Sequence, residues 1–344
     1  RQPVSGHPFV QQWPMPLHCL VAEAGGRPRR QMARRGAWLA VGASCVALTG
    51  LAHEWPVAAL SPRMPCARVV VTDVDGTLMG SSHELPPGNR CALLRCLQRG
   101  IPVVLATGKH RGPWVKDLIS SVAGGGVGVA SAWTLNAPGV FVQGLLVCDA
   151  GGRVVHRKVL PPHVVHACYE LASRRGWTLL AYAEDDRILA NRADVRFERL
   201  QRLREPVVEV TPMADADAHK LLVLVEAAEE TSVRRELAVA VGQEASMTVA
   251  IPGMVEVLPR GASKADGVGV ALELLGLDPG DALAIGDGEN DVELLQLVRA
   301  AGGPTAAVAN SRQALKDVAG SLVASCDDCG WAEAVERWVL GPCA

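Results

Sequence analysis

From residue 67 onward, short apolar runs alternate with stretches of helical periodicity. Residues 67–72 form an apolar run, residues 89–99 have helical spacing, and residues 102–106 are apolar again. Residues 113–122 continue the pattern with a second expected helix. Strands that alternate with helices at this spacing indicate βαβ units on a parallel sheet.

The middle of the chain has a different pattern, in which hairpins occur among the helices. Residues 140–148 and 153–159 flank the Gly-rich turn 149–152, which favours a hairpin. Further elements are expected as a helix at 162–175, strands at 178–183 and 221–225, a helix at 229–241, and two short strands within 247–258 around Pro252–Gly253. An α+β segment of this kind predicts a second domain inserted into the first.

The last third of the chain returns to alternating elements. Helices are expected at 264–275, 290–300 and 332–340, and strands at 282–285, 306–309 and 321–324. We therefore predict an α/β fold with a Rossmann-like parallel-sheet core. Its two parts span residues 66–148 and 254–344, and the inserted domain spans residues 149–253.

Residues 1–65 differ from the rest in composition. They hold seven Arg, no Lys and two Glu, a net charge of +5, so the remainder carries −7 of the total of −2. A basic stretch at 27–35 precedes the uncharged residues 37–52, which are fewer than the ~20 that a membrane span needs. This pattern predicts a disordered targeting or leader segment, with Met32 as a candidate start, and no stable membrane insertion of the mature protein.

The composition of the whole chain argues against nucleic-acid binding. The 34 basic and 36 acidic side chains nearly balance, and aromatic residues make up only 4%. The ten Cys are scattered and indicate a reducing compartment. Cys326 and Cys329 have the spacing of a redox pair or half a zinc site, but because no second pair accompanies them we interpret the spacing as coincidental.

Polar residues follow three of the expected strands where those strands end. Asp73 and Asp75 follow the first strand, Thr107 and Gly108 the second, and Asp287 a third near the C-terminus. Ligands of open α/β sheets bind beyond the carboxyl ends of the strands. If these strands are neighbours, several carboxylates meet, and their mutual repulsion requires a cation. Oxygen ligands favour Mg²⁺ over zinc.

Carboxylates around Mg²⁺ suit phosphoryl transfer, because the metal neutralises phosphate charge. One of Asp73 and Asp75 can attack phosphorus and form an acyl-phosphate, while the other handles the proton of the leaving group. Thr107 can donate a hydrogen bond to a phosphate oxygen. Lys264 can balance the added negative charge.

Together these segments resemble the four motifs of the haloacid dehalogenase-like superfamily. Their order and spacing are similar to the Cof-type branch, subfamily IIB, which carries an α+β (C2B-type) cap between the second and third motifs. The resemblance covers about residues 66–344, and residues 138–147 are similar to a stretch of plant and algal plastid members. The matching segments are Asp73–Leu78 (DVDGTL), Ala106–Gly108 (ATG), Gly261–Lys264 (GASK) and Gly286–Asp291 (GDGEND).

The resemblance implies a role for each matching residue. Asp73 is the nucleophile that becomes aspartyl-phosphate, and Asp75 is the general acid and then the base. Mg²⁺ is held by Asp73, the backbone carbonyl of Asp75, and Asp287. Asp291 orients Lys264 or a metal-bound water. The residues implied to bind the phosphoryl group are Thr107, Gly108, Lys264 and Asn290.

Several residues depart from the pattern or offer alternatives. Lys109 stands where the family often has Arg, and Asp266 adds an acid near Lys264. Lys220 is a rival to Lys264, whereas His110 and His219 are expected to be surface or hydrogen-bonded residues rather than catalysts. The remaining Gly-rich stretch lacks a dinucleotide fingerprint and is discounted; it comprises Gly124, Gly125, Gly126 and Gly128.

The implied function is a Mg²⁺-dependent phosphatase acting on a small phosphorylated metabolite, such as a sugar phosphate or a phosphorylated cofactor. Two alternatives stay open: a phosphotransferase or phosphomutase that keeps the same aspartates, and a non-catalytic regulatory binding module. The basic N-terminal segment and the plastid-like stretch predict a plastid or another organelle, with the cytoplasm as the alternative. The sequence leaves open the oligomeric state and which phosphorylated substrate is used.

Overall fold

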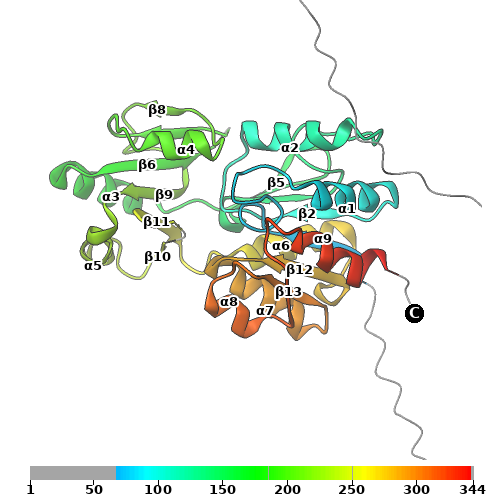
Figure 1. Ribbon diagram of the computed structural model, residues 1–344. Helices are drawn as coiled ribbons and strands as arrows, with labels where there is room; N and C mark the ends of the chain where they lie inside the picture. The colour runs from blue at the N-terminus through cyan, green and yellow to red at the C-terminus, as the bar shows by residue number, and fades with distance from the viewer. Residues whose placement is uncertain (1–66, 185, 250, 342–344) are drawn as a thin grey trace, which may run out of the picture. The chain divides into compact units, whose positions relative to one another are not determined.

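The computed structural model describes residues 67–184, 186–249 and 251–341 (Figure 1). The predicted targeting segment, residues 1–65, lies outside the described residues. Within them, no helix combines the length and the apolar character that crossing a membrane requires.

Five parallel strands form the core sheet, in the order β14-β13-β12-β1-β2. The strand β1 lies between β12 and the edge strand β2: Val69 pairs with Ala282 on one side, and Val70 pairs with Val103 on the other. The prediction of a parallel-sheet α/β core is therefore confirmed. The strands are β1 (Val69–Thr72), β2 (Val103–Leu105), β12 (Ala282–Gly286), β13 (Thr305–Val308) and β14 (Ser321–Val323).

Helices cover both faces of this sheet, so its strands are apolar on both sides. Val70 packs in one cluster with residues of α1, α2 and α9, whereas Val69 and Val71 pack in another with residues of α6, α7 and α8. This alternation follows from the two-residue period of a strand. The helices are α1 (Pro87–Gln98), α2 (Pro113–Ala123), α6 (Lys264–Leu275), α7 (Val292–Ala300), α8 (Gln313–Val318) and α9 (Gly330–Val335).

Near the C-terminus, two of the expected continuous helices are each divided into two shorter helical segments. The helix expected at 290–300 begins as a 3₁₀ turn, Glu289–Asp291, and the one expected at 332–340 becomes α9 followed by a π-helical turn, Glu336–Leu340. A further 3₁₀ turn, Pro279–Asp281, precedes β12.

A three-stranded antiparallel sheet lies next to the core and corrects one prediction. The strand expected at 140–148 is interrupted by a 3₁₀ turn, Val142–Gly144, with Gln143 at φ 60°. The backbone N–H groups of Val142 and Gln143 donate to the carbonyls of Lys109 and Thr107 instead of to a strand partner. The hairpin around residues 149–152 is confirmed. The strands are β3 (Gly139–Phe141), β4 (Leu146–Cys148) and β5 (Val154–Arg157).

A six-stranded sheet forms the second folded region, in the order β10-β11-β9-β6-β7-β8. One of its faces packs against α3 (Pro162–Arg175) and α5 (Glu230–Val241), which is preceded by a 3₁₀ turn, Ala227–Glu229. The other face shares an apolar cluster with the core. Three short elements in it, β7, α4 and β8, are not predicted from the sequence. The remaining elements are β6 (Thr178–Ala183), β7 (Ile188–Ala190), α4 (Phe197–Arg202), β8 (Val208–Val210), β9 (Ala218–Leu224), β10 (Ala245–Thr248) and β11 (Met254–Pro259).

The sheets differ from the predicted boundaries of the inserted domain, 149–253. The strand β5 falls inside that range but pairs with β4 beside the core. The strand β11 falls outside it but pairs with β9 and β10, because its alternate residues Val255 and Val257 belong to the apolar cluster under α3 and α5. We propose that the inserted cap spans about residues 161–259.

Candidate active site

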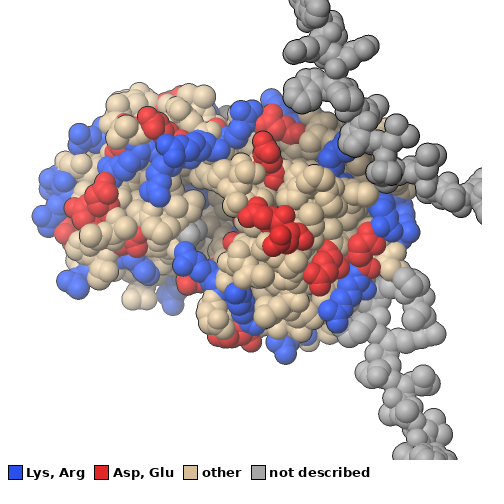
Figure 2. Space-filling view, in the orientation of Figure 1, with Lys and Arg blue, Asp and Glu red and all other residues tan. Residues whose placement is uncertain are grey.

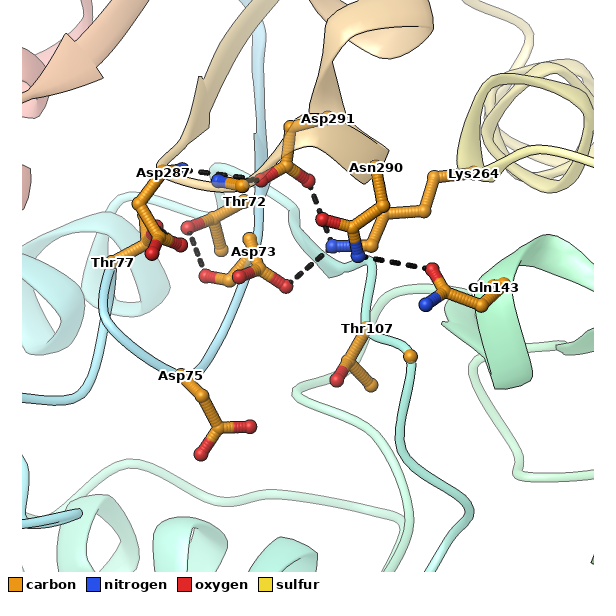
Figure 3. Close-up of polar contacts among 12 residues, drawn as sticks. Thr72, Asp73, Asp75, Thr77, Thr107, Gln143, Lys264, Asp287, Asn290 and Asp291 are labelled. Atoms are coloured by element: carbon orange, nitrogen blue, oxygen red, sulfur yellow. Dashed lines mark hydrogen bonds and ion pairs between the residues drawn. The ribbon is translucent and has the colours of Figure 1, made fainter. Parts of the chain in front are cut away.

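The predicted motif residues come together at the carboxyl ends of three neighbouring strands (Figure 3). Because β1 lies between β2 and β12, Asp73 sits between the loop that carries Thr107 and the loop that carries Asp287. The expectation that these strands are neighbours is confirmed. The site is therefore a direct product of the strand order.

Lys264 connects the first and last motifs. Its Nζ atom lies 2.6 Å from Oδ1 of Asp73 and 2.7 Å from Oδ1 of Asp291. Ser263 caps the helix that begins at Lys264, with its hydroxyl accepting from the N–H of Asp266 at 3.3 Å. Burial alone would lower the pKa of Lys264, but the two carboxylates hold that pKa above its ordinary value, so the ammonium form persists.

Both carboxylate oxygens of Asp291 accept hydrogen bonds from groups within the protein. Its Oδ2 atom accepts hydrogen bonds from the backbone N–H groups of Asp287 and Gly288, at 3.1 and 3.0 Å, while Oδ1 accepts from Lys264. Gly286 permits this approach, because a Cβ atom there would lie 2.6 Å from the Asp291 side chain. Asp291 therefore fixes the loop and Lys264 together.

Three carboxylates form a cluster whose donor atoms fit a hard divalent cation. Oxygens of Asp73, Asp287 and Asp291 all lie within 4.8 Å of one another. Burial and the neighbouring negative charges raise the pKa of Asp73 well above its ordinary value, and they raise that of Asp287 as well. All-oxygen donors that repel one another in this way suit Mg²⁺. Since Asp291 is already engaged, Asp73 and Asp287 are the two carboxylates available to an ion.

The turn after β1 allows Asp287 to approach the first motif. Gly76 has a φ of +74°, and a Cβ atom there would lie 2.7 Å from Oδ2 of Asp287. On the same loop, the hydroxyl of Thr77 donates to Oδ1 of Asp287 at 2.9 Å. In the first motif, Gly76 thus leaves room for the Asp287 carboxylate of the last motif, and Thr77 donates a hydrogen bond to it.

The carboxylate of Asp75 points away from the Asp73 cluster (Figure 3). It accepts a hydrogen bond from Nζ of Lys109 at 2.8 Å, and Nδ1 of His83 lies 3.4 Å away. Burial alone would raise the pKa of Asp75, but the hydrogen bond from His83 and the charge of Lys109 bring it below its ordinary value. Asp75 is therefore set apart from Asp73 by both position and acidity.

Gln143, which sequence reasoning missed, links the loop that carries Asn290 to Glu256 of the cap. Its Oε1 accepts from Nδ2 of Asn290 at 3.0 Å, and its Nε2 donates to Oε2 of Glu256 at 3.1 Å. A Cβ atom on Gly108 would lie 2.6 Å from Nε2 of Gln143, so the two loops touch. The available signal was a single polar residue inside the apolar run 140–148.

Lys220 lies in the same region but does not take the place of Lys264. Its Nζ donates to Oε1 of Glu256 at 2.6 Å and to the carbonyl oxygen of Gly108 at 2.9 Å. Lys264, not Lys220, contacts Asp73. The geometry therefore favours Lys264 as the lysine of the site.

The two histidines set aside from catalysis are both buried rather than on the surface. Nε2 of His110 lies 2.7 Å from the carbonyl oxygen of Ala183, and its Nδ1 accepts from the N–H of Arg111. Nδ1 of His219 lies 2.8 Å from the carbonyl oxygen of Lys158, while its Nε2 has no partner among the described residues. Both histidines lie away from the aspartate cluster, in a neighbouring pocket.

Cys326 and Cys329 are free thiols. Their loop contacts the loop after the first motif, where Oδ1 of Asp327 accepts from the N–H of Ser81 at 2.8 Å. This contact gives the loop a structural role.

A cavity of about 190 Å³ opens over the motif residues and extends to the cap. Its floor holds Asp73, Asp75 and Thr107, and its cap side holds, among others, Tyr182 and Lys220. The space-filling view shows the surface hollowed between the cap and the core (Figure 2). The aspartates are thus reached from a partly enclosed space.

Comparison with known proteins identifies the family. The profile of the haloacid dehalogenase-like hydrolases matches residues 70–335. The chain belongs to this family. The structure also superposes on a haloacid dehalogenase-like hydrolase from Bacteroides thetaiotaomicron with a TM-score of 0.66 at 26% identity, covering 79% of this chain and 99% of that one.

Two proteins are similar to this chain in sequence over most of its length. An Arabidopsis thaliana protein named chloroplastic endoribonuclease YBEY is 34% identical over 278 residues, which are 79% of this chain and 46% of that protein. This chain thus spans about half the length of that relative. A Yersinia pestis HMP-PP phosphatase is 27% identical over 287 residues, 80% of this chain and 96% of that protein.

A further solved structure shows the same fold at low sequence identity. A sugar phosphatase of subclass IIB of the superfamily has the same fold, with a TM-score of 0.64 at 17% identity over 78% of this chain and 98% of that one. By the profile match, the chain is a Cof-type hydrolase of the haloacid dehalogenase-like superfamily, and the prediction of an enzyme of the phosphatase class is confirmed at the level of the family.

Proposed function

We propose that the chain is a Mg²⁺-dependent phosphatase that hydrolyses a small phosphorylated metabolite through an aspartyl-phosphate on Asp73. The observation that carries this proposal is the contact of Lys264 with both Asp73 and Asp291 beneath a cavity that Asp73 and Asp287 line. The similarity to the Yersinia pestis HMP-PP phosphatase supports it.

Asp73 is proposed as the nucleophile. Lys264 holds its Oδ1 atom, which orients the carboxylate and leaves Oδ2 to attack phosphorus. Lys264 is fully buried and is not among the residues that line the cavity, so it acts from behind the nucleophile. Its permanent charge offsets the negative charge that accumulates on Asp73 and the phosphoryl group.

Asp73, Asp287 and the backbone carbonyl of Asp75 are proposed to hold Mg²⁺. When bound, the ion neutralises charge on the phosphoryl oxygens. Thr77 keeps the Asp287 carboxylate in place through its hydroxyl. Asp291 keeps the backbone of the same loop in place.

Asp75 is proposed to move the protons of both half-reactions. Its side chain lines the cavity and points away from Lys264 (Figure 3). The leaving oxygen, and later the attacking water, are proposed to lie beside it. The negative charge of a bound phosphate raises the pKa of Asp75, so that Asp75 can take up a proton when substrate binds and donate it to the leaving oxygen as the phosphoryl group passes to Asp73. The resulting carboxylate, which Lys109 stabilises, then takes a proton from the water that hydrolyses the aspartyl-phosphate.

Thr107, Gly108 and Asn290 are proposed to bind the phosphoryl oxygens. Thr107 and Asn290 line the cavity next to Asp73. Oε1 of Gln143 accepts a hydrogen bond from Nδ2 of Asn290, which orients the Asn290 amide. This leaves the second N–H of that amide for a phosphate oxygen.

The test is release of inorganic phosphate by the full chain from p-nitrophenyl phosphate and a panel of phosphorylated metabolites, with Mg²⁺ and with EDTA. We expect Mg²⁺-dependent release that Asp73→Asn abolishes. Equal rates for Asp73→Asn and the unmodified protein would contradict the proposal. Transfer of phosphate to an acceptor sugar without release of inorganic phosphate would favour the phosphotransferase alternative. Mg²⁺ binding without any turnover would favour the non-catalytic regulatory alternative.

An organelle, in particular the plastid, is proposed as the location. The basic composition of residues 1–65 and the chloroplastic name of the Arabidopsis relative support it. Fusion of residues 1–65 to a fluorescent protein tests it, and a uniformly cytoplasmic signal would contradict it.

A further inference from the structure

The cap side of the active-site cavity combines an apolar wall with two buried carboxylates. Leu200, Leu203 and Ile251 supply the apolar surface, and Glu205 and Glu256 supply the carboxylates. These residues surround the part of a substrate that extends beyond the phosphoryl group. Their chemistry therefore selects the leaving group.

The two lysines that line the cavity have no donor left for a ligand. The three N–H bonds of Lys220 are directed at Glu256, at the carbonyl of Gly108, and at the ring of Tyr182, whose centroid is 4.2 Å away.

The ammonium of Lys109 is used in the same way. It contacts Asp75 at 2.8 Å, the carbonyl oxygen of Leu203 at 3.4 Å, and the ring of Trp114 at 4.4 Å from its centroid. Among the described residues, no arginine lines the cavity. A second anionic group on the substrate would therefore find no free cation.

The two glutamates, in contrast, still have acceptor capacity. Glu205 accepts from the hydroxyl of Tyr182 at 3.2 Å and from the N–H of His110 at 3.1 Å. Glu256 accepts from Lys220 and Gln143. Because a carboxylate has about four lone-pair positions, each can accept further hydrogen bonds from a ligand. Lys220 compensates the charge of Glu256, and burial raises the pKa of Glu205, so the cap side offers hydrogen-bond acceptors and no net positive charge.

We propose that this cavity selects phosphomonoesters whose leaving group is a compact ring with amino or hydroxyl donors and without a second anionic group. The apolar wall contacts the face of the ring, and Glu205 and Glu256 accept from its donors. A volume of about 190 Å³ is below the ~300–1,000 Å³ of sites for drug-sized ligands, which restricts the leaving group to a single ring. This inference rests on the proposed phosphatase function.

The test uses two substrates that share one ring and differ in one group. Pyridoxine 5′-phosphate carries a hydroxymethyl group where 4-pyridoxic acid 5′-phosphate carries a carboxylate. We expect kcat/KM of the full chain with Mg²⁺ to be at least about tenfold higher for the first, which corresponds to about 1.4 kcal/mol. Equal values, or a preference for the carboxylate, would overturn the inference.

Variants assign the preference to the cap. Leu203→Arg supplies a free cation and Glu205→Gln replaces a carboxyl that would oppose a second anionic group by an amide that can donate to it, so each is expected to reduce the ratio of the two kcat/KM values severalfold. Glu198→Gln is the matched control, because Glu198 is an exposed residue of the same helix region that pairs with Arg202. If Leu203→Arg and Glu205→Gln leave the ratio as unchanged as the control does, the assignment to the cap is overturned.

A further measurement separates this inference from the proposed function. Hydrolysis of p-nitrophenyl phosphate, whose aromatic ring carries no second anionic substituent, reports the phosphatase chemistry itself. If that reaction proceeds with Mg²⁺ while the matched substrates are used equally, only the selection fails. If p-nitrophenyl phosphate is not hydrolysed at all, the proposed function fails, and the inference with it.

Discussion

The ammonium of Lys109 lies 2.8 Å from the carboxylate of Asp75 and 3.4 Å from the carbonyl oxygen of Leu203 in the cap. One side chain of the second motif thus contacts both the proposed proton-transfer residue and the cap. The acidity of Asp75 therefore depends on a group that also contacts the cap.

Replacing Lys109 by Met should change the pH dependence of the reaction. Lys109 helps to keep the pKa of Asp75 below its ordinary value, so its removal raises that pKa. A general acid must be protonated in the enzyme–substrate complex, so kcat falls as pH rises through its pKa in that complex. The fall should therefore occur at higher pH in Lys109→Met, whereas Lys109→Arg should stay close to the unmodified protein. An unchanged pH–rate profile in the Met variant would contradict this role.

Replacing Lys264 by Met should destabilise the fold as well as abolish activity. Lys264 and Asp291 are both fully buried, and removing the lysine leaves two carboxylates without their cation. Breaking a buried pair of this kind costs about 3–5 kcal/mol of unfolding free energy. Urea denaturation measures the change. Lys116→Met, at an exposed lysine of α2, should stay within about 0.5 kcal/mol, and an equally small effect of Lys264→Met would refute the prediction.

Mg²⁺ should stabilise the protein increasingly as pH rises. The pKa values of Asp73 and Asp287 are raised in the folded protein, so in metal-free protein their stabilising contribution is present at acid pH. It is lost as pH rises through the raised values, because ionised carboxylates then repel one another. A bound cation removes that repulsion, and at 100 times its Kd it adds about 2.7 kcal/mol.

Thermal denaturation at several pH values, with Mg²⁺ and with EDTA, measures this effect. Asp287→Asn should melt higher than the unmodified protein in EDTA at neutral pH, and should respond little to Mg²⁺. Asp266→Asn, at an exposed acid of α6, should keep the full Mg²⁺ response. A Mg²⁺ response that is the same in both variants would speak against the proposed ligands.

Replacing Gln143 by Leu should weaken phosphate binding. The change leaves the amide of Asn290 and the carboxylate of Glu256 each short of one hydrogen bond. A buried polar group without its partner costs about 1–3 kcal/mol. We expect kcat/KM to fall by about tenfold, mainly through KM, with a smaller decrease in unfolding free energy. A loss confined to stability would show that Gln143 only supports the fold.

Sequence reasoning located the aspartates well for a physical reason. In a parallel sheet the carboxyl ends of neighbouring strands lie at one edge, so motifs that follow strands meet there whatever the length of chain between them. Asp73 and Asp287 were therefore placed without any knowledge of the cap. The resemblance implies that Asp291 orients Lys264 or a metal-bound water, whereas the contact of Lys264 with Asp73 is not predicted from the sequence.

The cap contacts could not be derived in that way. The Lys220–Glu256 pair depends on the register of β9 against β11, and the position of Gln143 depends on a turn whose N–H groups bond to the second motif instead of to a strand. The short elements β7, α4 and β8 carry too few residues to show a period. Such features follow from packing between distant segments, which local patterns do not record.

The pairing of Val69 with Ala282 has a consequence for the order of events during synthesis. The ribosome completes the whole cap, which is continuous in sequence, before it makes β12. Domains fold as units while the chain grows, so the cap can reach its final structure while β1 still lacks its partner on one side. Asp73 then acquires Asp287, Asp291 and Lys264 in the last stage, and the nascent enzyme stays inactive until its C-terminal third has emerged.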